Sequence, residues 1–220
     1  MTFTTTFTTV GVGGFSSNAG KTTLMCELLR ALSPGWEAIK ITRGHYRSCG
    51  KDPHACCVSH LLAEEPVIRS GRAETYAAGK DTGRYWDAGA SNVHWVVVTD
   101  AQVERGIKSA LERVRSRGVL IEGTSFVRFI EVDLMLMAAR ASGAEKIKPS
   151  ARRALSKTSA LYLFEEGGGE DDVRLARARF EAWRAAPGEN AARGIPVYTR
   201  EDLPRLIERV REVQRGGVAA

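Results

Sequence analysis

Long apolar runs are the first feature that the sequence lacks. No window in the 220 residues approaches the roughly 18–20 apolar residues that a membrane-spanning helix requires. The N-terminal stretch from Met1 to Thr9 is rich in threonine and contains no lysine or arginine, so it does not resemble a signal peptide. We therefore expect a protein that has no membrane partner.

Cysteine is also scarce, with four residues in the chain. A small secreted domain held together by disulfides would carry a denser and more regular set. Such low cysteine content is more typical of a protein from a reducing compartment. We therefore expect a cytoplasmic location.

Aromatic residues make up 7% of the chain and do not alternate with basic residues. The net charge is +6 and the isoelectric point is near 9.3, but lysine and arginine are scattered rather than clustered. The pattern argues against a nucleic-acid partner and favours a soluble protein whose binding site takes anions. With 43% hydrophobic residues, no internal repeat and no long linker, residues 1–220 are expected to form a single domain.

One segment carries a strong functional signal, the glycine-rich sequence VGVGGFSSNAGKTT at residues 10–23. An apolar run at 6–13 predicts a strand before it, and a leucine stripe at 21–32 predicts a helix after it. A strand, a glycine-rich loop ending in Gly-Lys-Thr and a helix together predict a phosphate-binding loop. The residues expected to contact a nucleotide here are Gly14, Ser16, Ser17, Asn18, Ala19, Gly20, Lys21, Thr22 and Thr23.

Individual roles in this loop follow from its chemistry. We expect Lys21 to reach the β and γ phosphates, Thr22 to ligate Mg²⁺ and Thr23 to contact the α phosphate. The loop departs from the common form, because Phe15 occupies the usual first glycine position and the glycine lies one residue earlier, at Gly14. No Asn-Lys-x-Asp motif for reading guanine is present, so the nucleotide is ATP or GTP.

The rest of the chain alternates apolar strands with amphipathic helices. This pattern predicts an α/β fold with a doubly wound, mainly parallel sheet of about seven strands flanked by helices. Ligands then bind at the carboxyl ends of the strands, where the phosphate loop lies. The strands are expected at 6–13, 37–42, 92–99, 118–123, 133–139, 159–164 and 195–199, and the later helices at 101–117, 173–186 and 201–214.

Glu122 ends an apolar strand, Val-Leu-Ile-Glu-Gly at 119–123. Together with an upstream phosphate loop, this pattern is typical of a second NTPase motif. Glu122 would then lie near Mg²⁺ and hold a metal-bound water or polarise an attacking group. The structural alternative is a solvent-exposed carboxylate at a strand end.

The segment GKDTGRYWDAGA at 79–90 is the next candidate. Lys80 and Arg84 are suited to contact phosphate or an anionic substrate, and Asp81 to orient a hydroxyl or a metal-bound water. The structural alternative is a helix cap at Asp81 or Thr82.

These motifs, taken in order with Lys40 on the second strand, resemble the molybdopterin-guanine dinucleotide biosynthesis adaptor family, MobB, of the SIMIBI class of P-loop NTPases. The likeness covers about two thirds of the chain. It implies a P-loop fold, binding of GTP or ATP and often a homodimer. The site residues that it implies are Lys21, Thr22, Lys80, Asp81, Arg84 and Glu122.

Two features differ from that family. Tyr85 stands where the family has a histidine, and the stretch between the second strand and Gly79 is longer. The phosphate loop itself looks more like that of cobyrinate and dethiobiotin synthetases. Those enzymes use ATP to phosphorylate a carboxylate.

An insertion at about 45–78 contains most of the cysteine and histidine. Thiolate and imidazole together suit Zn²⁺, which takes four tetrahedral ligands. Alternatively, these residues line an acceptor site, with His45 as a base or a cysteine as a reactive thiol, or they form a structural loop. His94 and Cys26 are expected to be structural. The candidate Zn²⁺ ligands are Cys49, His54, Cys56, Cys57 and His60.

Three functions follow from these observations. The first is Mg²⁺-dependent nucleotide hydrolysis or phosphoryl transfer in cofactor assembly, as in MobB. The second is a metal-handling NTPase that uses the Cys/His segment. The third is an ATP-dependent small-molecule kinase or carboxylate ligase. In each case the acceptor, whether a small molecule or a protein, is unknown.

Overall fold

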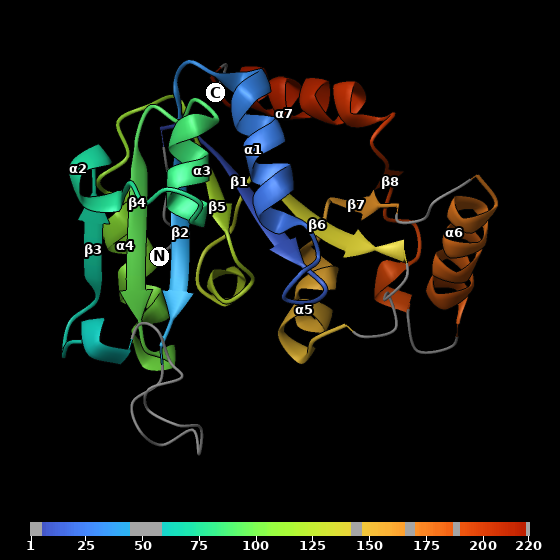
Figure 1. Cartoon of the computed structure of the whole chain (residues 1–220), viewed down its shortest axis with the longest axis horizontal. Coiled ribbons are helices and arrows are strands. Elements are labelled where there is room, and N and C mark those ends of the chain that lie inside the picture. Colours follow the sequence, from blue (N-terminus) through green and yellow to red (C-terminus); the bar gives the residue numbers. More distant parts are fainter. Residues whose placement is uncertain (1–5, 45–58, 142–146, 166–169, 187–189, 219–220) are drawn as a thin grey trace.

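The computed structural model describes residues 6–44, 59–141, 147–165, 170–186 and 190–218. Its centre is an eight-stranded sheet in the order β3-β4-β2-β5-β1-β6-β7-β8 (Figure 1). All neighbouring strands are parallel except β3, which runs antiparallel to β4. The strands are β1 Thr8–Gly14, β2 Trp36–Arg43, β3 Val67–Ser70, β4 Val93–Val98, β5 Gly118–Glu122, β6 Leu134–Arg140, β7 Ala160–Phe164 and β8 Val197–Tyr198.

The predicted α/β fold with a mainly parallel sheet is confirmed, with eight strands rather than about seven. The additional strand is β3, within a stretch for which the sequence pattern predicted no element. Its four residues, Val-Ile-Arg-Ser, are all half-buried and do not form an apolar run. A short edge strand with one partner shows little periodicity, so pattern alone does not reveal it.

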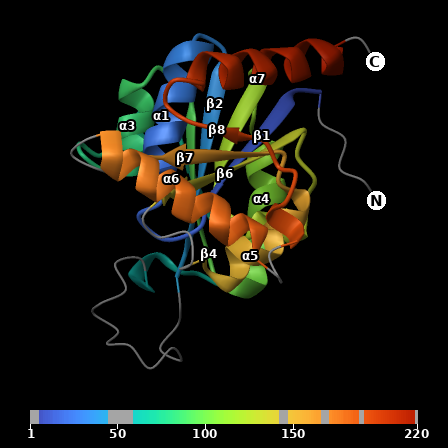
Figure 2. The same cartoon turned by 90° about the vertical axis from the view of Figure 1, so that its right-hand side faces the viewer.

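Helices cover both faces of the sheet (Figures 1 and 2). The core on one face contains residues of α1 Lys21–Leu32, α3 Asp81–Asp87 and α7 Leu203–Val218. The core on the other face contains residues of α4 Val103–Leu111, α5 Pro149–Ala154 and α6 Glu170–Ala185. The short helix α2 Arg72–Thr75 follows β3 directly. Both faces of the parallel strands are therefore buried, as such sheets require.

The helix predicted at 101–117 is shorter in the structure, so the prediction is wrong for its last turns. A 3₁₀ turn at Asp100–Gln102 leads into α4, which ends at Leu111. Beyond it, the backbone N–H groups of Arg115 and Ser116 donate to a Glu37 carboxylate oxygen at 2.8 and 2.9 Å. These side-chain contacts take the place of helical hydrogen bonds, while Val114, the last residue of the apolar stripe, is still buried in the core.

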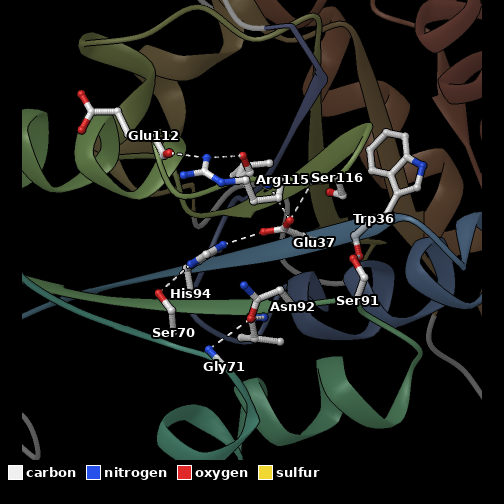
Figure 3. A network of polar contacts seen from close by, with 12 residues as sticks. Trp36, Glu37, Ser70, Gly71, Ser91, Asn92, His94, Glu112, Arg115 and Ser116 are labelled. Carbon is white, nitrogen blue, oxygen red and sulfur yellow. Dashed lines mark hydrogen bonds and ion pairs between the residues drawn. The ribbon is translucent and has the colours of Figure 1, made fainter.

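A buried polar network joins β2, β3 and β4 (Figure 3). Nε2 of His94 lies 2.6 Å from Oε2 of Glu37, and Nδ1 lies 2.8 Å from Oγ of Ser70. His94 is 1% exposed and Glu37 is 3% exposed. Each ring nitrogen of His94 thus has a partner inside the protein, which fits the structural role expected for this residue.

None of the helices in the described ranges is both long enough and apolar enough to cross a lipid bilayer.

Candidate functional site

The glycine-rich loop lies between β1 and α1, at the carboxyl edge of the sheet (Figure 1). Gly20 caps α1 with a φ of 88°, and a Cβ at this position would lie 2.3 Å from the ring of Phe164. Glycine is required there both for the left-handed backbone and for the close approach. No side chain caps the first turn of α1, so its backbone N–H groups remain suited to an anion.

Phe15 occupies the usual first glycine position because its side chain is part of the core. It is 1% exposed, and its ring centroid lies 5.2 Å from that of Trp183 and 6.4 Å from that of Phe180, both on α6. Its backbone carbonyl also accepts a hydrogen bond from the N–H of Lys148 at 2.8 Å. The unusual residue therefore fixes the start of the loop to its neighbours.

Lys21 bends back over the loop. Its ammonium donates to the carbonyls of Ser16 at 3.3 Å and Ser17 at 3.2 Å. Burial lowers the pKa of Lys21 from its usual value, and the charges of Lys40 and Lys148 act in the same direction, whereas Glu122 opposes them. The lysine is thus a partly desolvated cation with both basic and acidic neighbours, and desolvation favours its contact with an incoming anion.

A charged cluster forms where β2, β5 and α3 meet. The ammonium of Lys40, on β2, lies 2.7 Å from Oδ2 of Asp81 and 2.7 Å from Oε1 of Glu122. The other Glu122 oxygen accepts a hydrogen bond from the Tyr85 hydroxyl and lies 3.5 Å from Oγ1 of Thr22. Glu122 is 2% exposed, so the alternative of a strand-end carboxylate in solvent is wrong, and the structure brings it to the loop instead.

The pKa shifts in this cluster show which charges prevail. Burial alone would lower the pKa of Lys40, but the carboxylates of Glu122 and Asp81 outweigh it and raise that pKa. Burial alone would raise the pKa of Asp81, but Lys40 and a hydrogen bond from Thr22 outweigh it and lower that pKa. Lys40 is therefore held protonated and Asp81 ionised.

A cavity of about 520 Å³ opens over this cluster and the loop, a volume in the range of small-molecule sites. Its lining combines predicted site residues with three basic residues that the motifs did not single out as ligands: Lys40, Arg140 and Lys148. The predicted residues that line it are Ser17, Asn18, Gly20, Lys21, Thr22, Thr23, Asp81, Arg84 and Glu122.

The remaining predicted residues lie outside this lining. Gly14 and Ser16 line a smaller adjoining cavity of about 140 Å³. Ala19 is fully buried beneath the loop. Lys80 is exposed at the position that caps α3, and its role as a phosphate ligand stays a prediction. The predicted caps Asp81 and Thr82 are instead the first residues of that helix.

Sequence reasoning missed Arg140 and Lys148 because they belong to no motif. Arg140 ends β6, and its guanidinium donates to the carbonyl of Asn18. The ammonium of Lys148 donates to Oγ of Ser17 at 2.6 Å. For Arg140 the available signal was its position, since a basic residue at the carboxyl end of a strand next to β1 approaches the loop, whereas Lys148 precedes α5 and offered no such signal.

The donor set at the loop fits Mg²⁺, the ion that the fold implies. Mg²⁺ prefers hard oxygen ligands and is held by one or two carboxylates together with substrate phosphates. Thr22, Asp81 and Glu122 supply a hydroxyl and two carboxylates close together, and the two carboxylates already share one cation, Lys40. The two carboxylates therefore already lie around a cation, the Lys40 ammonium, which fits their expected role as Mg²⁺ ligands.

The Zn²⁺ prediction is not tested. Cys49, His54, Cys56 and Cys57 lie outside the described residues. His60 is exposed in a 3₁₀ turn at Ser59–Leu61. Among the residues that the structure covers, no group of three or more His, Cys, Asp and Glu side chains is arranged to hold a metal ion.

Comparison with known proteins identifies the fold and no family. No family model and no curated protein matches the chain. Among solved structures, the nickel complex of HypB from Helicobacter pylori has a TM-score of 0.53 at 12% identity, over 96% of this chain and 89% of that one. The ATP complex of LpxK from Aquifex aeolicus has a TM-score of 0.46 at 16% identity, over 71% and 48%. The GDP complex of the signal recognition particle 54 kDa protein from Aeropyrum pernix has a TM-score of 0.42 at 14% identity, over 97% and 51%.

The likeness to HypB, with the glycine-rich loop after β1, defines a P-loop NTPase-like α/β fold. At these identities the comparison speaks to the fold alone, and the chemistry has to be argued from this chain's own residues.

Proposed function

We propose that this protein binds a Mg²⁺–nucleoside triphosphate at the 14–23 loop and hydrolyses it or transfers its γ-phosphoryl group. The observation that carries the proposal is the convergence of Lys21, Thr22, Asp81 and Glu122 on one cavity at the carboxyl edge of the sheet. These four residues come from α1, α3 and β5, so only the fold brings them together.

Charge neutralisation is the main work that the site can do. Lys21, Arg84, Arg140 and Lys148 surround the cavity with positive charge, which suits a triphosphate and the charge that spreads over its γ-phosphoryl oxygens during transfer. Thr22, Asp81 and Glu122 would hold Mg²⁺, which would supply positive charge to the phosphates. Glu122, fixed by Lys40 and Tyr85, is positioned to orient the attacking group.

Removal of the Lys21 ammonium tests the proposal. We expect Lys21→Ala to weaken nucleotide binding by about a hundredfold or more, because a charge-assisted contact to phosphate is lost from a partly desolvated site. Isothermal titration calorimetry with Mg²⁺ and a non-hydrolysable ATP or GTP analogue measures this. Lys108→Ala is the matched control, since Lys108 pairs with Glu104 on the surface of α4. Equal affinity in the wild type and in Lys21→Ala would refute the proposal.

Substitution of Glu122 separates binding from turnover. Glu122→Gln keeps the size of the side chain and an oxygen that faces the Mg²⁺ site, where Thr22 and Asp81 remain. We therefore expect the nucleotide to bind within about threefold of wild type while turnover falls by about a hundredfold or more. A phosphate-release assay beside the calorimetry measures both. Unchanged turnover would remove Glu122 from the mechanism.

The specific role rests on the resemblance to MobB, which implies work in cofactor assembly. Two alternatives remain as predictions, a metal-handling NTPase and a small-molecule kinase or carboxylate ligase. Metal analysis of the purified protein separates them: a stoichiometric ion that is lost in Cys56→Ser/Cys57→Ser while nucleotide binding persists favours metal handling. Protein without metal, whose turnover requires an added acceptor, favours the kinase or ligase.

A further inference from the structure

A second large cavity lies at the same edge of the sheet and shares no lining residue with the cavity proposed for the triphosphate. Its volume is about 450 Å³. The end of β2, the connection between β5 and β6, and the α5 region form its walls. The polar and charged lining residues that matter here are Arg43, Asp100, Thr124, Arg128, Arg153 and Lys157.

The lining is strongly basic. Arg43 and Asp100 form an ion pair at 2.7 Å and neutralise each other. In contrast, Arg128, Arg153 and Lys157 make no ion pair with any carboxylate in the described part of the chain. Lys157 donates to the carbonyl of Val127 at 3.1 Å, and the guanidinium of Arg128 lies 5.6 Å from the centre of the Phe129 ring. Three cations therefore face one cavity without compensating negative charge, which attracts anions.

The cavity lined by Arg128, Arg153 and Lys157, called the basic cavity below, adjoins the nucleotide cavity through a smaller one with which both share lining residues. The smaller cavity of about 140 Å³ shares Arg43, Thr124, Ser125 and Ser150 with the basic cavity. The same small cavity shares Lys21 and Lys148 with the nucleotide cavity. The basic cavity therefore lies next to a small cavity whose lining includes Lys21, the residue expected at the γ phosphate.

The small cavity between the two larger ones is lined mostly by polar side chains. Oγ1 of Thr124 lies 3.4 Å from Oγ of Ser150, and both hydroxyls line the basic cavity as well as the small one. Hydroxyls that can both donate and accept suit an oxygen-rich ligand. The cations and hydroxyls of these two cavities match a small ligand that carries anionic groups.

We propose that the basic cavity binds a small molecule with two or more carboxylate or phosphate groups, and that this molecule is the compound on which the nucleotide-dependent step acts. The second half of this statement rests on the proposed nucleotide function. The first half stands on the cavity alone. Its volume holds a small metabolite, and its spread of cations matches several anionic groups rather than one.

Binding of two simple anions tests the proposal. Glutarate represents the carboxylate class, glycerol 3-phosphate the phosphate class, and glycerol is the neutral control. Each is titrated by calorimetry into wild-type protein, first free and then saturated with Mg²⁺ and a non-hydrolysable ATP analogue that fills the phosphate loop. We expect at least one anion to bind the nucleotide-loaded protein and glycerol not to bind. The anion that binds identifies the class.

Two double variants locate the binding. Arg153→Ala/Lys157→Ala removes two cavity cations, and we expect it to weaken anion binding by about tenfold or more without changing nucleotide binding. Arg205→Ala/Arg215→Ala removes the same charge from α7, at the opposite end of the sheet, and should change anion affinity by less than about twofold (Figure 1).

The outcomes separate the two proposals. If neither anion binds protein that does bind the nucleotide analogue, or if Arg153→Ala/Lys157→Ala binds the anions as tightly as wild type, this inference is overturned and the nucleotide function stands. If the nucleotide analogue does not bind, the proposed function fails, and the titrations of free protein still decide whether the basic cavity takes anions.

Discussion

Lys40 is the residue on which the chemistry of the site depends most. It joins Asp81 and Glu122 with two contacts of 2.7 Å, and it comes from a strand that a P-loop motif does not include. A cation between two carboxylates offsets the repulsion that their charges would otherwise exert on each other. The site can therefore exist in the folded protein without bound Mg²⁺.

Replacement of Lys40 should reveal this role. In Lys40→Met the two carboxylates lose their shared cation while Glu122 stays buried, so we expect a loss of about 2–4 kcal/mol in the free energy of unfolding. The pKa of Asp81 should rise toward its usual value, because Lys40 is what outweighs the effect of burial. Urea unfolding and NMR titration of the carboxyl group measure the two effects.

The effect of Mg²⁺ on stability tests whether Lys40 is the cation that Asp81 and Glu122 share. It should stabilise Lys40→Met more than the wild type, since the variant lacks a competing cation at the two carboxylates. Lys108→Met, which breaks an exposed pair, should cost less than about 1 kcal/mol. If Lys40→Met were as stable as the wild type and no more sensitive to Mg²⁺, Lys40 would not be the cation that holds the two carboxylates together.

Glu37 makes the stability of the fold depend on pH. Burial raises its pKa, but hydrogen bonds from His94 and from the N–H groups of Arg115 and Ser116 outweigh this effect, and the net pKa is lowered. A lowered pKa means that the carboxylate stabilises the fold above its unfolded value of about 4.3, and that this stability is lost as the pH falls through the folded value.

We therefore expect wild type to exceed Glu37→Gln in free energy of unfolding at neutral pH, with the difference shrinking below about pH 4. Urea unfolding from pH 3 to pH 7 measures it. Glu104→Gln on the surface is the control, and its difference from wild type should stay below about 0.5 kcal/mol. If the difference in free energy of unfolding between wild type and Glu37→Gln stayed constant from pH 3 to pH 7, the lowered pKa of Glu37 would be contradicted.

At the scale of elements, α6 and the phosphate loop are packed together through Phe15. Its ring contacts Phe180 and Trp183, and its carbonyl is bound by Lys148. A common P-loop has glycine at this position and lacks such a contact. The departure from the motif thus has a packing explanation that the sequence pattern alone could not supply.

Phe15→Ala should loosen this packing. Loss of a fully buried aromatic side chain is expected to cost about 3–5 kcal/mol and to expose α6 to exchange with solvent. Hydrogen exchange read out by mass spectrometry should show faster exchange in 170–185 than in α7, which packs into the core on the opposite face of the sheet. Equal acceleration in the two helices would indicate global unfolding instead.

Elements with a strong local pattern were predictable, whereas those defined by long-range contacts were not. Residues 21–32 combine a leucine stripe with a Pro-Gly stop, and α1 has these bounds. The short strand β3 and the one-and-a-half-turn helix α5 have no such pattern. The end of α4 depends on Glu37, far away in the sequence, so periodicity placed it several residues too late.

At the scale of the whole molecule, the parallel sheet collects the ends of several strands at one edge. Lys21, Thr22 and Glu122 belong to motifs and could be named from the sequence as expected site residues. Arg140 and Lys148 belong to no motif: Arg140 reaches the loop from the end of β6, beside β1, and Lys148 reaches it from the N-cap of α5. The basic cavity is equally invisible to motifs, since its cations come from three separate segments.

A crystal structure with Mg²⁺ and a non-hydrolysable ATP or GTP analogue tests the central claim most directly. The claim predicts the triphosphate along residues 17–23, its γ phosphate within hydrogen-bond distance of Lys21, and Mg²⁺ bound to Thr22 on the side that faces Glu122. Triphosphate bound elsewhere on the protein, or a loop that remains empty at saturating analogue, would contradict it.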